Sequence, residues 1–409
     1  MSAHLIVIGG GAAGVFCAVN AARLSPHLKV TVIEKTSKLL SKVKVSGGGR
    51  CNVTHHNFDP VWFSQQYPRG ERFVRKAFYN FFSPDTIQWF EERGVKLHAE
   101  VDGRMFPTTN NSQTIIDCLL KDAEKYGVRF LMQTEVKKIE RRDPDWCVML
   151  SNQQEMKAQF ICIASGGFNK PEGYAWLKAL HHTIIQPVPS LFTFPLPDHP
   201  IRTLMGVSVH KVSVKIQGEK LKESGPLLIT HWGFSGPVIL RLSAWGARLL
   251  HDNNYQFTIW VNWLDDMKEE EFKLFMQHQR KENGGKKIYA GCPFDLSSRL
   301  WCYFLNASGI EEDKRWADLT QKQQQSLMQQ LIAGEYHVSG KTTFKEEFVT
   351  AGGVDLKQIN PATMESKLQK GLYFAGEVMD VDGITGGFNF QHAWTSGFIV
   401  AQSVAKTLL

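Results

Sequence analysis

Short runs of consecutive apolar residues alternate with segments of helical periodicity near both ends of the chain. Residues 4–24, HLIVIGGGAAGVFCAVNAARL, are an apolar run, a glycine turn and an Ala-rich helical stretch, which predict the start of a β-α-β unit. Residues 29–35, KVTVIEK, supply a second strand whose composition indicates burial on both faces. Residues 159–167 and 370–378 are further apolar strands that end in glycines, and 386–409 form a terminal helix. The pattern predicts an α/β domain assembled from both ends of the chain.

The middle of the chain follows a different pattern. Residues 186–200 hold five prolines, which exclude a regular helix and mark a domain boundary. Residues 206–216 and 255–263 alternate apolar and polar positions, as half-buried antiparallel strands do. A charged segment and a Gln-rich segment follow, and Leu327 and Leu331 in the latter recur at helical spacing after a candidate N-cap, Thr320. We therefore expect an α/β domain over 1–190 and 346–409, and an inserted β-rich domain over 191–345 with a helical lobe at about 264–334.

Composition narrows the class of protein. The 409 residues are 43% hydrophobic and 21% charged, which indicates a soluble chain of two or three domains. The net charge of +7 is mild, and no long block of like charge occurs, so a nucleic-acid partner is not expected, whereas acidic or phosphate-bearing ligands stay open. Seven cysteines without C-x-x-C or zinc spacing predict free thiols and no metal. Residues 1–9 lack the features of a signal peptide or membrane span, so we expect a cytoplasmic protein.

The glycine turn after the first strand carries a nucleotide-binding motif. Gly9, Gly11 and Gly14 satisfy G-x-G-x-x-G between a strand and a helix. In this motif the first glycine allows the tight turn, the second lets a pyrophosphate reach the backbone, and the third lets helix and strand pack closely. Glu34 ends the second strand, where an acidic residue binds a ribose hydroxyl. The motif favours dinucleotide binding over the alternative, a tight β-α turn in an unrelated α/β fold.

A second glycine pair distinguishes between dinucleotides. The closing strand ends in Gly376-Glu377, and Gly386-Gly387 precede the terminal helix. The N-terminal N–H groups of that helix could stabilise negative charge on a reduced isoalloxazine ring. FAD needs one such device for its pyrophosphate and another for its flavin, whereas NAD needs only the first, so the sequence favours FAD.

The chain resembles the BaiN-like, or aminoacetone-oxidase-like, family of FAD-binding proteins over nearly its whole length. The resemblance rests on the segments VIGGGAAG, KVSGGGRCNVT, DGRMFP, THWGFSGPVILRLS, TAGGV, TMESK and GLYFAGEVMDVDGITGGFNFQHAWTSG. It implies a two-part Rossmann-type FAD-binding domain interrupted by a β-barrel-like domain with a helical subdomain.

The motif and the resemblance together imply a set of cofactor-binding residues. The SGGGRCN segment is expected beside the FAD, with Arg50 as a planar cation, while Cys51 has a packing or polar role rather than a redox one. Val136 is expected to hold the adenine through its backbone. The full set is Gly9, Gly11, Ala12, Ala13, Gly14, Glu34, Lys35, Lys42, Lys44, Gly48, Gly49, Arg50, Cys51, Asn52, Val136, Ala164, Ser165, Gly166, Gly376, Glu377, Gly387, Asn389, Phe390 and Gln391.

Two histidines are candidates for catalysis. His231, in THWGFSGP, is interpreted first as a buried, satisfied residue of a β-turn and only second as catalytic. His392 stands where relatives commonly carry an aromatic residue, and we place it in the first turn of the terminal helix. There the helix dipole would keep it neutral and able to exchange a proton, although filling the space of an aromatic residue is an equal alternative. The loop over 164–182 is also shorter than in many relatives, so no relative's substrate is transferred.

These observations predict an FAD-dependent oxidoreductase that passes hydride between flavin and a small organic substrate bound where the two domains meet. NADH or NADPH is a candidate electron donor. Because no second G-x-G-x-x-G follows a strand, nicotinamide would have to visit the open flavin face. Two alternatives stay open, namely a flavin-binding sensor without turnover and a flavin-dependent RNA-modifying enzyme, to which the net charge of +7 points. The substrate and the oligomeric state are not predicted.

Overall fold

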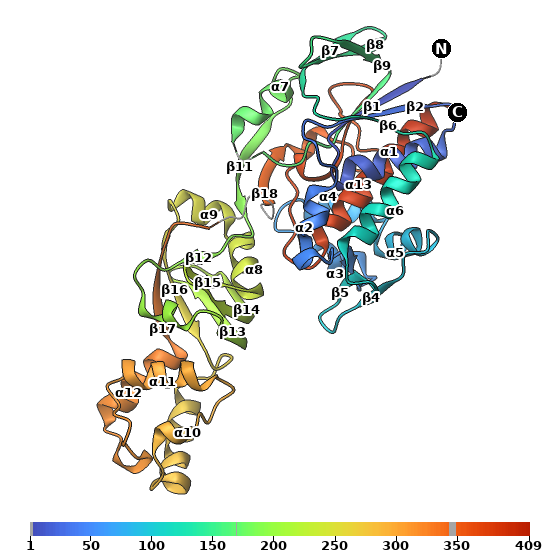
Figure 1. The fold of residues 1–409 in the computed structure, drawn as a ribbon. Helices are drawn as coiled ribbons and strands as arrows, with labels where there is room; N and C mark the ends of the chain where they lie inside the picture. Colours follow the sequence, from blue (N-terminus) through green and yellow to red (C-terminus); the bar gives the residue numbers. More distant parts are fainter. Residues whose placement is uncertain (1–2, 169, 343–348) are drawn as a thin grey trace. The chain divides into compact units, whose positions relative to one another are not determined.

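The computed structural model describes residues 3–168, 170–342 and 349–409 (Figure 1). The chain forms two compact units, one of Met1–Ser190 with Phe344–Leu409 and one of Leu191–Thr343. It passes from the first unit to the second after Ser190, and the expected return at 345–346 lies outside the described residues. We call the first the FAD unit and the second the inserted unit.

A parallel sheet forms the centre of the FAD unit. Its strand order is β19-β10-β1-β2-β6. The strands are β1 (His4–Ile8), β2 (Lys29–Ile33), β6 (Arg129–Leu131), β10 (Phe160–Ile163) and β19 (Leu372–Phe374). In β1 every residue is buried, because helices cover a parallel sheet on both faces. The strand β19 from the end of the chain pairs with β10 from its first half, which confirms the discontinuous Rossmann-type domain.

Two helices from opposite ends of the sequence pack together on this sheet. Helix α1 (Ala12–Leu24) and helix α13 (Phe388–Thr407) lie side by side, with α6 (Ser112–Lys125) next to α1 (Figure 1). Their close approach depends on Gly397, where an added Cβ would come within 2.6 Å of the Ala13 carbonyl oxygen. This contact packs the start of α1 against the middle of α13.

Smaller elements complete the FAD unit. Two antiparallel sheets contain β3 (Thr54–His55), β5 (Arg104–Pro107) and β4 (Leu97–Ala99), and β7 (Val136–Arg142), β8 (Asp145–Leu150) and β9 (Glu155–Ala158). Strand β11 (Ile184–Ser190) pairs with β18 (Val349–Val354). The short helices are α2 (Ser41–Gly49), α3 (Pro60–Ser64), α4 (Glu71–Phe78), α5 (Ser83–Glu91), η1 (Pro171–Tyr174) and α7 (Ala175–Lys178). Strand β5 lies between β3 and β4, and its residues Met105 and Phe106 are buried.

The inserted unit is built on an antiparallel, nearly closed barrel-like sheet, as expected. Its order is β12-β15-β14-β13-β16-β17. The strands are β12 (Phe194–Pro195), β13 (Ser208–Ile216), β14 (Lys222–Ile229), β15 (Gly233–Ser235), β16 (Gln256–Asn262) and β17 (Gly334–Ser339), with α8 (Pro237–Trp245) and α9 (Ala247–Asp252) alongside. Phe257, Ile259 and Val261 of β16 point into the core while the residues between them are more exposed, which is the predicted alternation.

A helical lobe extends the inserted unit. It contains α10 (Glu269–Asn283), α11 (Ser298–Ala307) and α12 (Gln321–Ile332). The Thr320 side chain caps α12 by accepting from Gln323 N–H at 3.2 Å, and Leu327 and Leu331 are fully buried. The Gln-rich stretch is therefore an ordered amphipathic helix rather than low-complexity sequence.

The described residues contain neither a membrane-spanning helix nor a cluster of metal ligands. Within residues 3–168, 170–342 and 349–409, no helix has both the length and the hydropathy needed to cross a bilayer. In the same ranges, His, Cys, Asp and Glu side chains form no group of three or more that could hold a metal ion.

Candidate flavin-binding site

The turn between β1 and α1 has the shape that a pyrophosphate requires. Gly9 has φ +113°, and an added Cβ there would lie 2.3 Å from the Ala164 carbonyl oxygen. A Cβ on Gly14 would lie 2.0 Å from the Gly9 carbonyl oxygen, so these two glycines allow the turn and the packing. At Gly11, in contrast, nothing lies within 4 Å of an added Cβ, and no side chain caps the helix. The N-terminal N–H groups of α1, which bears Ala12 and Ala13, are thus open to an anionic ligand.

Glu34 is held beside this turn. Its Oε2 accepts from Gly10 N–H and its Oε1 from Thr36 N–H, both at 2.8 Å. Each carboxylate oxygen can accept a further hydrogen bond, so the fixed carboxylate can also receive ribose hydroxyls. Its position at the end of β2 agrees with the expected ribose-binding role.

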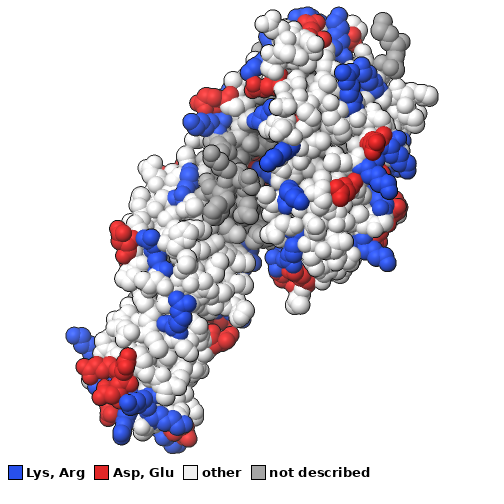
Figure 2. Space-filling view, viewed as in Figure 1, with Lys and Arg blue, Asp and Glu red and all other residues white. Residues whose placement is uncertain are grey.

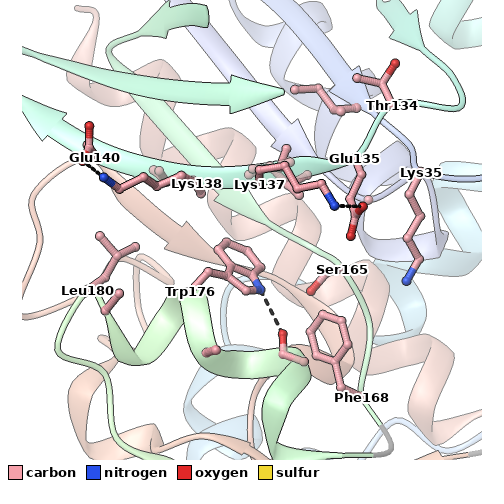
Figure 3. Close-up of a pocket in the computed structure, with 18 of the residues that line it drawn as sticks. Lys35, Thr134, Glu135, Lys137, Lys138, Glu140, Ser165, Phe168, Trp176 and Leu180 are labelled. Atoms are coloured by element: carbon pink, nitrogen blue, oxygen red, sulfur yellow. Dashed lines mark hydrogen bonds and ion pairs between the residues drawn. The ribbon is translucent and has the colours of Figure 1, made fainter. Parts of the chain in front are cut away.

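A cavity of about 910 Å³ opens from this end of the sheet (Figure 3). Five of the expected cofactor residues line it, namely Gly9, Glu34, Lys35, Val136 and Ser165. Figure 3 shows the strand that carries Lys137 and Lys138 on one side, and the helix that carries Trp176, followed by Leu180, on the other. The volume lies in the range of nucleotide and cofactor pockets, and its position fits the adenosine half of FAD.

The cavity also contains residues that the sequence did not indicate. Trp176, Phe168 and Lys138 line it together with the expected positions. Trp176 is held in place because its Nε1–H donates to the Gly173 carbonyl at 2.9 Å. Lys137 and Lys138 could have been noticed, since they follow Val136 directly on one strand, but no sequence signal brings Trp176 to that strand.

The glycine run that follows Ser46 leaves open space at its backbone. Gly47, Gly48 and Gly49 all have positive φ, and they interrupt α2 with left-handed turns. An added Cβ at Gly48 or Gly49 would meet nothing within 4 Å, whereas at Gly47 it would come within 2.9 Å of the Phe106 ring. Gly166, after β10 and Ala164, is likewise open and left-handed. These open glycine backbones suit the close approach of a cofactor.

The charged side chains near the run are already paired. The Arg50 guanidinium lies 4.0 Å above the Phe106 ring, and its Nη1 donates to Glu100 Oε1 at 2.6 Å. Lys44 Nζ donates to Gln113 Oε1 at 2.8 Å. These contacts fix the Arg50 guanidinium beside the run while a third of its side chain stays exposed, and its contact with the cofactor remains a prediction.

Cys51 is fully buried. Burial raises the pKa of its thiol to about 12, so the sulfur stays protonated at neutral pH. This environment supports the packing role that the sequence analysis favoured over a redox role.

The side chain of Glu377, in the Gly376-Glu377 turn, bonds both helix α2 and strand β18. Glu377 Oε2 accepts from Lys42 Nζ at 2.6 Å and Oε1 accepts from Thr350 N–H at 2.8 Å. Gly376 has φ +72°, and its N–H donates to Ser396 Oγ at 2.9 Å. Thr350 and Ser396, which fix this turn, were not predicted from the sequence, because neither is its neighbour in the chain.

The N-terminus of α13 is held by side chains that were expected to contact the cofactor. Asn52 Oδ1 accepts from Gly387 N–H at 2.9 Å. Both amide atoms of Asn389 bond the Gly383 backbone, at 2.8 and 2.9 Å, and Gln391 Oε1 accepts from Thr54 and Thr86 hydroxyls. The amides of Asn389 and Gln391 therefore position the helix rather than point toward a ligand.

The backbone at this helix end remains available. The N-cap Gly387 has φ +93° and offers no side chain, and the first N–H groups of α13 have no acceptor within the helix. The Phe390 ring stacks on the ring of Trp394, one turn further along the helix, with centroids 5.7 Å apart, and this contact holds the Phe390 side chain against the helix. The arrangement suits an electron-rich flavin edge, as the glycine pair predicted.

His392 is placed differently from the prediction. It is the fifth residue of α13, beyond the first turn, and it is only 2% exposed. Its Nε2–H donates to the Gly376 carbonyl at 3.3 Å, and its Nδ1 is enclosed by protein. Burial lowers its pKa to about 4, so the ring is neutral at pH 7. Because neither ring nitrogen is exposed, the structure favours the alternative in which His392 fills the space of an aromatic residue.

His231 lies in the inserted unit, within a tight turn. Thr230 N–H donates to the Gly233 carbonyl at 2.8 Å, and Arg202 Nε donates to the His231 carbonyl at 2.7 Å. The turn was expected, but the side chain of His231 is exposed rather than buried.

Comparison with known proteins identifies the cofactor and the class of chemistry. The family model described as "HI0933-like protein Rossmann domain" matches residues 3–403. A ribosomal RNA dihydrouridine synthase of Haemophilus influenzae is 30% identical, over 98% of both chains. A 3-dehydro-bile acid delta(4,6)-reductase of Clostridium scindens is 25% identical, also over 98% of both chains.

A solved structure supports the fold. The open conformation of a flavocytochrome c3 fumarate reductase superimposes with a TM-score of 0.52 at 17% identity, over 100% of this chain and 78% of the other. The match to the family model confirms the BaiN-like resemblance, and the cradle of open glycines and uncapped helices fits FAD. The chain belongs to the HI0933-like family of Rossmann proteins and is an FAD-dependent oxidoreductase.

Proposed function

We propose that this protein reduces the C5=C6 double bond of a uridine in ribosomal RNA. One observation carries the proposal: the similarity to a ribosomal RNA dihydrouridine synthase, 30% identical, runs through 98% of both chains. It therefore includes both units and not the nucleotide-binding motif alone.

The second relative supports the type of bond. Uracil C5=C6 is conjugated with the C4 carbonyl, and the bile-acid reductase is named for a delta(4,6) substrate that carries a 3-keto group. In both compounds a carbonyl activates an alkene toward hydride, which adds to the β-carbon while a proton adds to the α-carbon. For uridine, hydride goes to C6 and the proton to C5.

The chain's own residues provide binding and orientation for this step. Bound FAD would supply the two-electron reduction. The open backbone at Gly11 and the start of α1 would hold the pyrophosphate, and Glu34 would hold the ribose. The uncapped start of α13 would direct N–H groups at the flavin. We assign the proton transfer to neither His392 nor His231, because the first is enclosed and the second is exposed in the inserted unit.

We further propose NADH or NADPH as the electron donor and the cytoplasm as the location. No second G-x-G-x-x-G follows a strand, which supports transient binding of nicotinamide at the flavin rather than in a separate domain. All seven cysteines are free thiols, which supports a reducing compartment.

The proposal departs from the expectation that nucleic acid is not a partner. That expectation rested on the absence of long runs of like charge in the sequence. Helical spacing can also bring basic residues together on one face, as on α4. Counting runs of like charge along the sequence therefore underestimates how basic a surface is. The proposal takes up the RNA alternative that the net charge of +7 had suggested.

A small-molecule enone reductase is the second candidate, supported by the bile-acid reductase relative. The two are separated by incubating the FAD-loaded protein under argon with NADPH or NADH and either in vitro transcribed ribosomal RNA or a 3-keto-4,6-diene steroid. We expect dihydrouridine in the digested RNA, detected by mass spectrometry, and unchanged steroid. Reduction of the steroid with no dihydrouridine would reject the RNA proposal in favour of the second candidate.

A further inference from the structure

Helix α4 presents a basic and aromatic stripe to solvent. Phe73, Val74, Ala77 and Phe78 form its buried face. Arg72, Lys76 and Tyr79 follow at intervals of four and three residues, so they share the opposite face, and all three are exposed. Arg75 lies at the edge of the same face and is half-buried.

Exposed apolar side chains also occur around α3 and at the end of α4. Phe58, which precedes α3, is 51% exposed, Val61 in α3 is 40% exposed, and Tyr79, which directly follows α4, is 73% exposed. The rings of Phe63 in α3 and Phe78 in α4 lie 5.3 Å apart, so the two helices pack against each other. We call Phe58, Val61, Arg72, Lys76 and Tyr79 the α3–α4 surface. Grouped exposed apolar residues of this kind mark interaction sites.

The charge of the surface fits an anionic partner. Among the described residues, no ion pair joins Arg72 or Lys76 to a carboxylate. The acidic neighbours are Glu71 at the start of α4 and Asp59, which caps α3 by accepting from Val61 N–H at 2.8 Å. Figure 2 shows Lys and Arg side chains over the region where Figure 1 labels α2 and α4. Basic side chains interleaved with exposed aromatic rings are the composition of single-stranded nucleic-acid sites.

The loop between α3 and α4 is bonded to the segment that leads into α13. Tyr67 Oη donates to the Phe388 carbonyl at 2.6 Å, and Ile384 N–H donates to the Gln66 carbonyl at 3.0 Å. Arg69 and Asp382 form a bidentate ion pair that is almost completely buried. The α3–α4 surface is thus fixed to the helix end that faces the flavin.

A cluster of three rings joins the same segments. The His55 ring lies 4.9 Å from Phe388 and 5.5 Å from Trp62, these two rings lie 6.3 Å apart, and His55 Nδ1–H donates to the Gly386 carbonyl at 3.1 Å. Phe388 is the first residue of α13, and Trp62 belongs to α3. A partner seated on α3 is therefore tied through packed rings to the flavin end of the unit.

We propose that the α3–α4 surface binds a single-stranded segment of RNA next to the uridine that is reduced; this inference rests on the proposed function. Bases stack on Phe58 and Tyr79, and phosphates pair with Arg72 and Lys76. Stacking on protein rings requires bases released from a duplex, so the site selects unpaired RNA.

The test uses the full-length, FAD-loaded protein and a fluorescein-labelled oligouridylate of about 15 nucleotides, the upper range of one such site. Binding is measured by anisotropy at several salt concentrations. The variants are Phe58→Ala, Tyr79→Ala and the double variant Arg72→Ala/Lys76→Ala. Matched controls are Leu274→Ala, 65% exposed on α10, and Lys322→Ala, exposed on α12.

We expect each aromatic variant to weaken binding by about 5-fold to 100-fold. The double variant should lower the slope of log K against log salt by about 1.4, since two phosphate contacts are lost. The controls should bind within about 2-fold of the parent, and all variants should keep the visible absorbance of FAD.

Three results would overturn the inference. If the parent binds the RNA and the variants match the controls, the surface is wrong while the proposed function stands. If the parent binds no RNA and forms no dihydrouridine, the proposed function fails with it. If Phe58→Ala converts an oligomeric parent to a monomer with unchanged RNA affinity, the surface binds a second copy of the chain.

Discussion

At the residue scale, Glu34 shows how one carboxylate shapes a turn and remains able to bind a ligand. Its two oxygens hold the backbone N–H groups of Gly10 and Thr36 and still have acceptor capacity. Replacing Glu34 with Ala should weaken FAD binding by about 10-fold to 100-fold, since a hydrogen bond to a charged group contributes about 1.5–3 kcal/mol. The measurement is FAD titration of the apoprotein. Glu155→Ala removes an exposed carboxylate paired with Arg142 and serves as the control; equal affinity in both variants would argue against the ribose role.

His392 makes a second prediction at this scale, based on pH. Its folded pKa of about 4 lies below the value of about 6.5 for an unfolded chain, so the unfolded state binds more protons between these values. Its contribution to stability is therefore present above about pH 6.5 and is lost as the pH falls toward 4. In His392→Phe, the drop in unfolding free energy from about pH 7 to 5 should shrink by up to about 2 kcal/mol.

The same variant should keep its FAD and its rate of flavin reduction by NADPH or NADH. A loss of rate with a changed pH profile would restore His392 as a proton donor and contradict the packing role. Denaturant titration at the two pH values and stopped-flow absorbance are the two measurements.

At the scale of the element, the β1–α1 turn separates two functions of glycine. A methyl group at Gly11 would enter open space, and its φ of −82° suits alanine, so Gly11→Ala should fold normally but exclude the pyrophosphate. A methyl group at Gly14 would lie 2.0 Å from a backbone oxygen, so Gly14→Ala should lose about 1–3 kcal/mol of stability or more. Thermal denaturation and bound flavin distinguish the two variants. Similar stability in both would contradict the geometry of this turn.

The same elements show what the sequence could and could not predict. The strand, turn and helix around Gly9–Gly14 were predictable, because spacing within one β-α-β unit encodes them locally. The partners of Gln391 and Arg50 were not, since Thr54 lies 337 positions before Gln391 and Glu100 lies 50 after Arg50. The first pair depends on how α13 packs on β3, and the second on how the turn between β4 and β5 meets the end of α2; no local pattern records either. The exposure of His231 was missed for the same reason, because it depends on which face of the turn the barrel covers.

At the scale of the whole molecule, the fold class and the cofactor followed from features repeated at both ends of the chain. Apolar strands that end in glycine turns occur near residues 9 and 376, and a glycine pair at 386–387 precedes the terminal helix. Together they indicated one sheet assembled from both ends of the chain. The substrate was not predictable in this way. We propose that its recognition depends on the α3–α4 surface, where residues are exposed and the sequence carries no periodic constraint beyond α4 itself.

The measurement that tests the central claim most directly is a single turnover without oxygen. The protein is reduced stoichiometrically with NADPH or dithionite and then mixed with in vitro transcribed ribosomal RNA, while flavin absorbance is followed and the RNA is digested for mass spectrometry. The account predicts that the oxidised flavin spectrum returns and that one dihydrouridine forms for each flavin oxidised. A flavin that stays reduced in the presence of this RNA, but is oxidised by a 3-keto-4,6-diene steroid, would contradict it.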